Sequence, residues 1–376
     1  MTNAGSSGEM TGGGIDLPPP VWDRDSRLSD AGRWSVMLQI LRHMLVATWA
    51  LTVCGASFAQ ASKSQTAIAY PTRPLRLIVP FPAGGGADHW GRLVSKELAD
   101  RLGQAVIVEN IPGAGGNEGT AVAAGANPDG YTLLLGSLGP LAVHQFTYSV
   151  LAFDPERNFV PIALLESSPI LLVASPTVSA SSAMNLIDFA RANPGILSYA
   201  SNGNGSPEHV AGELFKKRLQ LEIRHLPYDG AGPARKAVLS GQASLMFDPC
   251  KGSLPAVRQG LQRALAVAAA VRLSELPAVP TFREVGVSQY ELRIWTGVLA
   301  PAGTSREIVT KLNQAIRGIL SAPEIKKEIA DEGGEAGSTT SDDFTAFLQT
   351  ERTRWSALVD ESGIPKVAAT PTTPAN

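Results

Sequence analysis

Residues 75–88 of the chain have the sequence LRLIVPFPAGGGAD. The first part, 75–81, is a short apolar run that ends at proline and glycine, which is typical of a buried strand. Glycines 84–86 predict a tight turn, and apolar side chains at helical spacing from Trp90 to Leu102 predict a helix behind it. A strand, a glycine-rich turn and a helix therefore open the folded part of the chain.

The same alternation continues along the sequence. Further strands are predicted at 106–108, 131–136, 197–200, 223–226, 243–247 and 264–268, and helices at 90–102, 121–126, 186–192, 210–219 and 305–320. A β-α-β-α-β order predicts an α/β fold with doubly wound, mostly parallel sheets. We place one domain at 70–172 and 285–362, a second at 173–284, and a flexible tail rich in proline and threonine at 363–376.

Composition narrows the class of protein. A length of 376 residues favours about two domains. With 44% apolar and 18% charged residues the chain is an ordinary globular protein. Its formal net charge is −2, and basic residues do not alternate with aromatic ones, which argues against nucleic acid as a partner.

The first sixty residues are set apart from the fold. Residues 1–32 are polar and rich in glycine and proline, so we predict a disordered leader. A basic flank at Arg42, an apolar run at 44–53 and small residues at 59–61 are typical of a secretory signal peptide. We therefore expect the leader and signal peptide, 1–61, to be removed near Ala61 and the mature protein to lie in the periplasm.

Two alternatives to cleavage stay open. The apolar run could remain as an uncut anchor, although it is short for a membrane span. Cys54 could carry a lipid, although Val53 is bulky for the residue before a lipid-modified cysteine. We prefer Met37 over Met1 and Met10 as the true start.

Cysteine usage agrees with export. Only Cys54 and Cys250 occur, and cleavage removes the first, so no disulfide can form within the mature chain. We interpret Cys250 as a small packing residue.

Two similar segments carry the functional prediction. Residues 81–88 (FPAGGGAD) and 201–206 (SNGNGS) each follow a predicted strand and precede a predicted helix. Glycine lets backbone N–H groups approach a ligand, and a helix start adds about half a positive charge. A carboxylate or a phosphate binds well at such a place. Because ligands of open α/β sheets lie at the carboxyl ends of the strands, we expect both loops to face one cleft.

Ordinary structural roles remain open for several of these residues. Either loop could be a packing turn, and Asp88 could cap its helix. His209 could lie on a helix surface, and Glu208 could serve the helix dipole. Tyr228 and Phe247, each at a strand end, fit the core as well as a ligand contact.

An enzyme is the alternative from another class. A dinucleotide loop at 84–86 lacks the G-x-G-x-x-G pattern. A Ser206–His209 nucleophile pair lacks the G-x-S-x-G elbow and a third residue to orient the base. H-E-x-x-H and clusters of cysteine and histidine are missing too, so we predict neither a metal nor a cofactor.

Many short motifs in the same order resemble one known family. They comprise Tyr70-Pro71 with 77–86 and Asp88, then 108–110, 112–116 and 128–134, and finally 193–195, 203–209, 227–228, 277–281 and 295–304. In this order they resemble the Bug-type receptors, the periplasmic binding proteins of tripartite tricarboxylate transporters. The resemblance spans about 70–362.

The resemblance implies a two-domain periplasmic-binding-protein (Venus flytrap) fold that closes on a carboxylate. By position, the family's pocket falls on Phe81, Gly85, Gly86, Ala87, Asp88, Ser137, Ser201, Asn202, Asn204, Gly205, Ser206 and His209, with Tyr228, Phe247 and Asp248 nearby. Ala87 stands where many members carry threonine or serine, so one hydroxyl contact is missing.

The resemblance also implies partners. These are transporter subunits. A sensor kinase as the partner is a separate alternative that stays open, and we expect a monomer without nucleic acid, metal or cofactor. The sequence leaves the identity of the carboxylate open.

Overall fold

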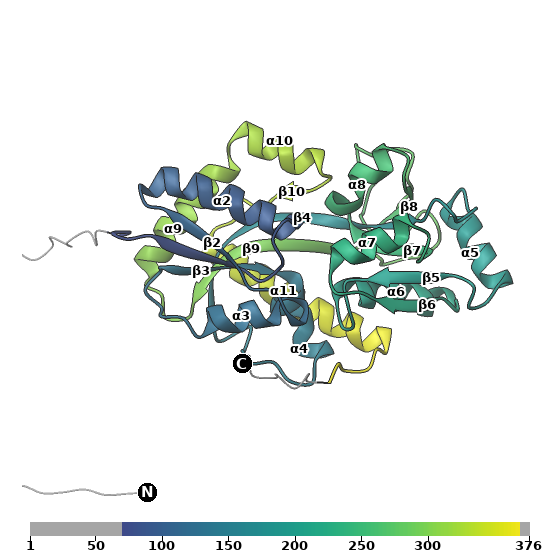
Figure 1. The fold of residues 1–376 in the computed structure, drawn as a ribbon, viewed down its shortest axis with the longest axis horizontal. Helices are drawn as coiled ribbons and strands as arrows, with labels where there is room; N and C mark the ends of the chain where they lie inside the picture. The colour runs from purple at the N-terminus through teal and green to yellow at the C-terminus, as the bar shows by residue number, and fades with distance from the viewer. Residues whose placement is uncertain (1–69, 369–376) are drawn as a thin grey trace, which may run out of the picture. The chain divides into compact units, whose positions relative to one another are not determined.

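A computed structural model of the chain describes residues 70–368 (Figure 1). The predicted leader and signal peptide, with Cys54 and Ala61, lie outside the described residues. Among residues 70–368, the strands are β1 (Leu75–Val79), β2 (Val106–Asn110), β3 (Thr132–Ser137), β4 (Phe159–Ala174), β5 (Ser198–Ser201), β6 (Arg224–Pro227), β7 (Leu245–Pro249), β8 (Arg263–Val267), β9 (Arg293–Pro301) and β10 (Glu335–Ala336).

Helices connect these strands. In the described part of the chain they are α2 (Gly86–Leu102), α3 (Asn117–Ala124), α4 (His144–Thr147), α5 (Ala183–Ala192), α6 (Pro207–Leu219), α7 (Ala231–Leu239), α8 (Cys250–Arg258), α9 (Arg306–Leu320), α10 (Pro323–Asp331) and α11 (Ser341–Ser362), with short turns η1 (Ala114–Gly116) and η2 (Gly139–Val143). None of the helices between residues 70 and 368 is both long and apolar enough to cross a bilayer.

The strands form one mixed sheet in the order β2-β1-β3-β9-β4-β7-β5-β6, and β8 and β10 pair with β4. The predicted doubly wound parts are parallel: β1 pairs in parallel with β2 and β3, and β5 with β6 and β7. The antiparallel pairs all involve β4 or β9. The α/β fold is confirmed, and two long antiparallel strands join its halves.

Strand β4 is shared by both halves of the sheet. It pairs with β9 from Phe159 to Pro169 and with β7 from Ile170 to Ala174. The chain returns at Leu292, whose N–H donates to the carbonyl of Ala268 just before β9 begins. The pairing of β4 therefore changes partner between Pro169 and Ile170, and the returning chain pairs again near Leu292.

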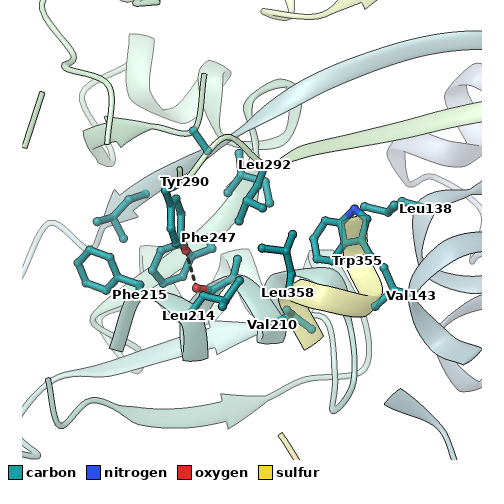
Figure 2. Packing of buried hydrophobic residues seen from close by; sticks show 14 of the residues in the cluster. Leu138, Val143, Val210, Leu214, Phe215, Phe247, Tyr290, Leu292, Trp355 and Leu358 are labelled. Atoms are coloured by element: carbon teal, nitrogen blue, oxygen red, sulfur yellow. Dashed lines mark hydrogen bonds between the residues drawn. The ribbon is translucent and has the colours of Figure 1, made fainter. Parts of the chain in front are cut away.

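Helix α11, near the C-terminus, contacts both halves of the fold. This helix, yellow in Figure 1, packs against η2 and against α6. In Figure 2, Trp355 and Leu358 of this helix lie between Val210 of α6 and Leu138, which precedes η2, and all four belong to one buried cluster. The start of the predicted tail is also held, because the N–H of Val367 donates to the carbonyl of Thr147 at 2.7 Å.

Local sequence explains where the helices begin. Ser305 caps α9, because its Oγ accepts the N–H of Ile308. Thr340 and Asp343 form a capping box at the start of α11. These caps fix two helices whose apolar faces cover the sheet.

Candidate functional site

The first glycine-rich loop ends at an uncapped helix. Gly85 occupies the N-cap of α2 with extended backbone (φ −88°, ψ 174°), and no side chain caps it. Gly85 and Gly86 are exposed, and a Cβ on Gly86 would meet no atom within 4 Å. The first N–H groups of a helix have no partner within the helix, so those of α2 are open to a ligand.

Asp88 orders this loop from behind. Its side chain is buried and accepts the N–H of Gly84 at 2.9 Å, Nε of Arg92 at 2.9 Å and Nδ2 of Asn110 at 3.0 Å. The hydrogen bond from Arg92 is the main reason why the pKa of Asp88 is lowered. Asn110 also donates to the carbonyl of Phe81 at 3.1 Å. Asp88 therefore shapes the loop, and its acceptors are already used.

The second loop ends at a capped helix. Ser206 is the N-cap of α6, and its Oγ accepts the N–H of His209 at 3.2 Å. Gly203 and Gly205 have φ of +126° and +77°, a conformation that glycine adopts readily. The N–H of Gly205 donates to Nδ1 of His209 at 3.1 Å. His209 thus faces inward and holds the loop.

One buried polar atom of this loop lacks a partner. Among the described residues, Oδ1 of Asn202 is buried and accepts no hydrogen bond. A buried acceptor without a partner is costly, so this position favours a ligand or a water that donates.

Ser206 and His209 do not contact each other in the way that a catalytic nucleophile and its base would. Nδ1 of His209 accepts the N–H of Gly205. The hydroxyl oxygen of Ser206 accepts the backbone N–H of His209. A hydroxyl–imidazole contact occurs elsewhere: Oγ of Ser201 lies 2.6 Å from Nε2 of His225. Ser201 is fully buried and lies 3.2 Å from both N and O of Gly203, so this contact holds the loop.

His225 is a residue that the sequence analysis missed. It lies on β6 directly opposite Tyr199 of β5, and Ser201 is opposite Pro227. Because β5 and β6 are parallel, both strands end at the edge where the second loop begins. The signal was present in the sequence, since a polar residue stands near the end of the strand that follows α6.

Contacts connect the two loops through η1 and α4. Gly116 lies against the Phe81 ring, where a Cβ would come within 3.1 Å of the ring. Gly115 lies beside Tyr148, whose hydroxyl donates to the carbonyl of Asn204 at 3.4 Å. The loops, which the sequence places far apart, are thus joined by residues 115–116 and 148.

The remaining predicted residues have varied surroundings. Ser137 ends β3 and is buried beside β9. Tyr228 is half-buried, and its N–H donates to the carbonyl of Ser201 at 3.1 Å. Ala87 is half-buried in the first turn of α2. Asn204 is exposed at the tip of the second loop.

Phe247 and Asp248 are both buried. Figure 2 shows the ring of Phe247 among other aromatic residues, including Phe215 and Tyr290, with ring centroids 5.4 and 6.3 Å away. Asp248 is fully buried and accepts from Nε of Arg235 at 2.7 Å. Phe247 is thus a core residue and Asp248 belongs to a buried ion pair, and their place near the ligand stays a prediction.

Glu208, behind the second loop, is buried as an acid. Burial raises its pKa to about 7, and Asp248 adds to the effect, while Ser206 and Arg235 oppose it. An interaction with the helix dipole is therefore not a sufficient account of Glu208, because its side chain is buried and the Asp248 carboxylate acts on it.

A hollow of about 310 Å³ lies apart from both loops. It is lined by Phe159, Leu299, Leu348 and Arg352 among others, between α11 and the residues before β4. Arg352 donates to the carbonyls of Leu141 and Pro155. No residue of the predicted pocket lines this hollow, so we keep the loops as the candidate site. Residues 70–368 also contain no group of three or more side chains suited to hold a metal.

A long strand shared by two halves, each with a glycine-rich loop before a helix, defines the two-domain periplasmic-binding-protein fold. The chain belongs to the tripartite tricarboxylate transporter family of receptors, whose family model matches residues 91–364. The resemblance to Bug-type receptors is thereby confirmed. This is a family of periplasmic solute-binding receptors and not of enzymes.

Three relatives illustrate the likeness. Protein BugT of Bordetella pertussis is 36% identical over 295 residues, which cover 78% of this chain and 90% of BugT. The structure of R. palustris Rpa4515 with adipate has a TM-score of 0.76 at 33% identity and covers 79% of this chain and 100% of that one. The structure of MatC (Rpa3494) from Rhodopseudomonas palustris with bound malate has a TM-score of 0.72 at 33% identity and covers 77% and 100%.

Proposed function

We propose that this receptor captures a small carboxylate between its two glycine-rich loops and delivers it to a tripartite tricarboxylate transporter. The observation that carries the proposal is the start of α2, where no side chain makes a cap hydrogen bond and Gly85 and Gly86 are exposed. Solved relatives at 33% identity contain adipate and malate, which are both dicarboxylates. A dicarboxylate has an anionic group for each loop.

The two loops would contribute different groups. The first offers main-chain donors at the α2 start. The second offers the buried acceptor of Asn202, which suits a hydroxyl of the ligand or a bridging water. Charge-assisted hydrogen bonds contribute roughly 1.5–3 kcal/mol each, so three or four suffice for about micromolar binding without an arginine.

We further propose that binding closes two domains, with boundaries near 70–172 with 285–362 and 173–284. The partner change of β4 between Pro169 and Ile170 supports a hinge there, because the strand leaves one half of the sheet and enters the other. The hydrogen bond from the N–H of Leu292 to the carbonyl of Ala268 supports a second hinge segment near Leu292. A ligand that touches both loops favours the closed arrangement.

A binding role without catalysis also fits the serine contacts. Ser206 caps a helix and Ser201 is fully buried, so neither hydroxyl is presented as a nucleophile. A sensor kinase as the partner is the second candidate; we favour the transporter because the family is defined by it.

A thermal-shift panel of adipate, malate and other carboxylates tests the proposal. A ligand at about 100 times its Kd adds about 2.7 kcal/mol of stability, which is a rise of several degrees in Tm for a chain of this size. Amines and neutral sugars of similar size serve as controls. Stabilisation by a sugar and by no carboxylate would contradict the proposed ligand class.

A further inference from the structure

Two imidazole rings stack beneath the second glycine-rich loop. The ring centroids of His209 and His225 are 3.9 Å apart, and the ring planes are 10° from parallel. Tyr199 also stacks on His225, with centroids 4.8 Å apart. The rings come from β5, α6 and β6, so the stack connects three elements at the base of the loop.

Each imidazole ring bonds a different part of the loop. Nδ1 of His209 accepts the N–H of Gly205 at 3.1 Å. Nε2 of His225 lies 2.6 Å from Oγ of Ser201, which in turn accepts the N–H of Gly203 at 3.2 Å. The pair therefore holds the loop at its first residue and near its last.

These bonds depend on the protonation state. Nδ1 of His209 can accept only when it carries no proton, so the neutral ring must carry its proton on Nε2. Protonation of His209 would set two N–H donors against each other at Gly205. Two protonated rings 3.9 Å apart would also repel.

The surroundings favour the neutral form of both rings. Burial is the main cause that lowers the pKa of His209, and burial followed by His209 lowers the pKa of His225 to about 4. The charged groups that act on both rings are Glu213, which raises each pKa, and Lys216, which lowers it. Lys216 and Glu213 are paired at 2.7 Å, so their effects largely oppose one another. Tyr199 faces the stack from β5 and donates its hydroxyl to Glu213 at 2.6 Å.

We propose that His209 and His225 are positioning residues that act as one neutral pair, hold the Ser201–Ser206 loop in its ligand-binding shape, and release the ligand in acid. This rests on the proposed function, since the loop is one wall of the proposed site. The histidines act through Gly205 and Ser201 and need not touch the ligand.

Nuclear magnetic resonance of the ligand-free protein tests the pair without any ligand. We expect His209 to carry its proton on Nε2, and the pKa of both imidazoles to lie below the ordinary histidine range. The Gly205 amide signal should shift only when the pair becomes protonated, and His89→Gln, which removes an exposed histidine, should leave that shift unchanged. A proton on Nδ1 of His209, or a Gly205 amide that ignores the titration of both rings, would overturn the proposal.

Non-titrating variants test the link to binding. In His209→Asn an amide oxygen replaces the Nδ1 acceptor, and in His225→Gln an amide nitrogen replaces Nε2. Adipate and malate are the probes, measured by calorimetry at about pH 7 and about pH 4. Because these acids titrate themselves, wild type and the double variant are compared at each pH.

The affinity of the wild-type protein should fall further than that of the double variant in acid, by about twofold or more once the pH reaches the His225 pKa of about 4. His225→Ala should weaken binding about tenfold at neutral pH, and His225→Gln should restore most of it. Equal pH profiles for wild type and the double variant would contradict the proposal. If neither probe binds any variant at either pH, the proposed ligand class fails, while the ligand-free titration still decides whether the pair holds the loop.

Discussion

The hydroxyl of Thr147 donates to the backbone carbonyl of Gly205 at 2.9 Å, although 58 residues separate the two. Thr147 is fully buried at the end of α4, and Gly205 is a turn residue of the second loop. Val367 lies against the same glycine, where a Cβ would come within 3.0 Å of its side chain. The second loop is therefore held by hydrogen bonds with His209 and His225, and also by contacts with Thr147 of α4 and with Val367.

Thr147→Val should show the contribution of this contact. The substitution keeps the shape and leaves the Gly205 carbonyl without its donor, so the free energy of unfolding should fall by about 1–3 kcal/mol. Urea denaturation measures it. Thr353→Val, at an exposed position of α11, is the matched control and should change stability by less than about 0.5 kcal/mol. Equal effects of the two variants would show that the loop does not depend on Thr147.

Gly85→Val should abolish ligand binding and leave the fold intact. Valine can adopt the extended backbone of Gly85, and its Cβ would approach only the carbonyl of Pro82, at 3.5 Å. Its branched side chain would cover the N–H groups of the α2 start, which should raise the Kd about hundredfold in calorimetry.

Gly232→Val is the control for the glycine substitution. Gly232 is exposed in the first turn of α7, and a Cβ there meets no atom within 4 Å. Its Kd should match the wild type. Unchanged affinity in Gly85→Val would show that main-chain donors of the first loop do not bind the ligand. Gly205→Val is a poorer test, because φ is +77° and Thr147 and Val367 crowd the position.

Glu208→Gln should change how stability depends on pH. Burial raises the folded-state pKa of Glu208 from 4.5 to about 7, so the folded state holds a proton that the unfolded state releases. The contribution of Glu208 to the free energy of unfolding is fully present below about pH 4.5 and is lost as the pH rises to about 7. Wild type should therefore lose about 2 kcal/mol or more relative to the variant across this range in urea denaturation. A variant that becomes less stable than wild type as pH rises would contradict this.

Ligand binding should make the protein more compact. A dicarboxylate that bridges both loops has higher affinity for the closed arrangement, so it shifts the population toward it. Small-angle scattering should give a smaller radius of gyration with saturating ligand and an unchanged molecular mass. Gly85→Val should show no compaction. Tight binding without any change in the radius would exclude a flytrap mechanism.

Export should remove the N-terminal segment. The sequence ends its apolar run with small residues at 59–61, which predicts cleavage after Ala61. Mass spectrometry of the periplasmic protein should show a chain that begins near Ser62. Recovery of the protein in the cytosol with Trp49 retained would contradict this prediction.

Sequence reasoning located the repeating strands and helices well, because their signals are local. The run at 75–79 and the Ser305 cap could both be placed from neighbouring residues. β4 was missed because Pro161, Glu166 and Pro169 interrupt its apolar pattern, and proline is normally excluded from central strands. The sheet tolerates Pro161 where the register with β9 shifts. Only long-range pairing revealed that one strand serves both halves.

The sequence by itself determined the α/β alternation, the two glycine-rich loops and the family resemblance, since each depends on residues close together in the chain. The tertiary structure decided which polar side chains form hydrogen bonds within the protein and which remain open to a ligand. Asp88 and Asp248 look alike in sequence as acids beside predicted loops, yet one orders a loop and the other pairs with Arg235 in the core. His225 gained its position only because β6 lies parallel to β5, which brings an imidazole within 2.6 Å of Ser201. Hydrogen bonds between distant segments depend on how strands pair, and strand pairing is a property of the folded chain.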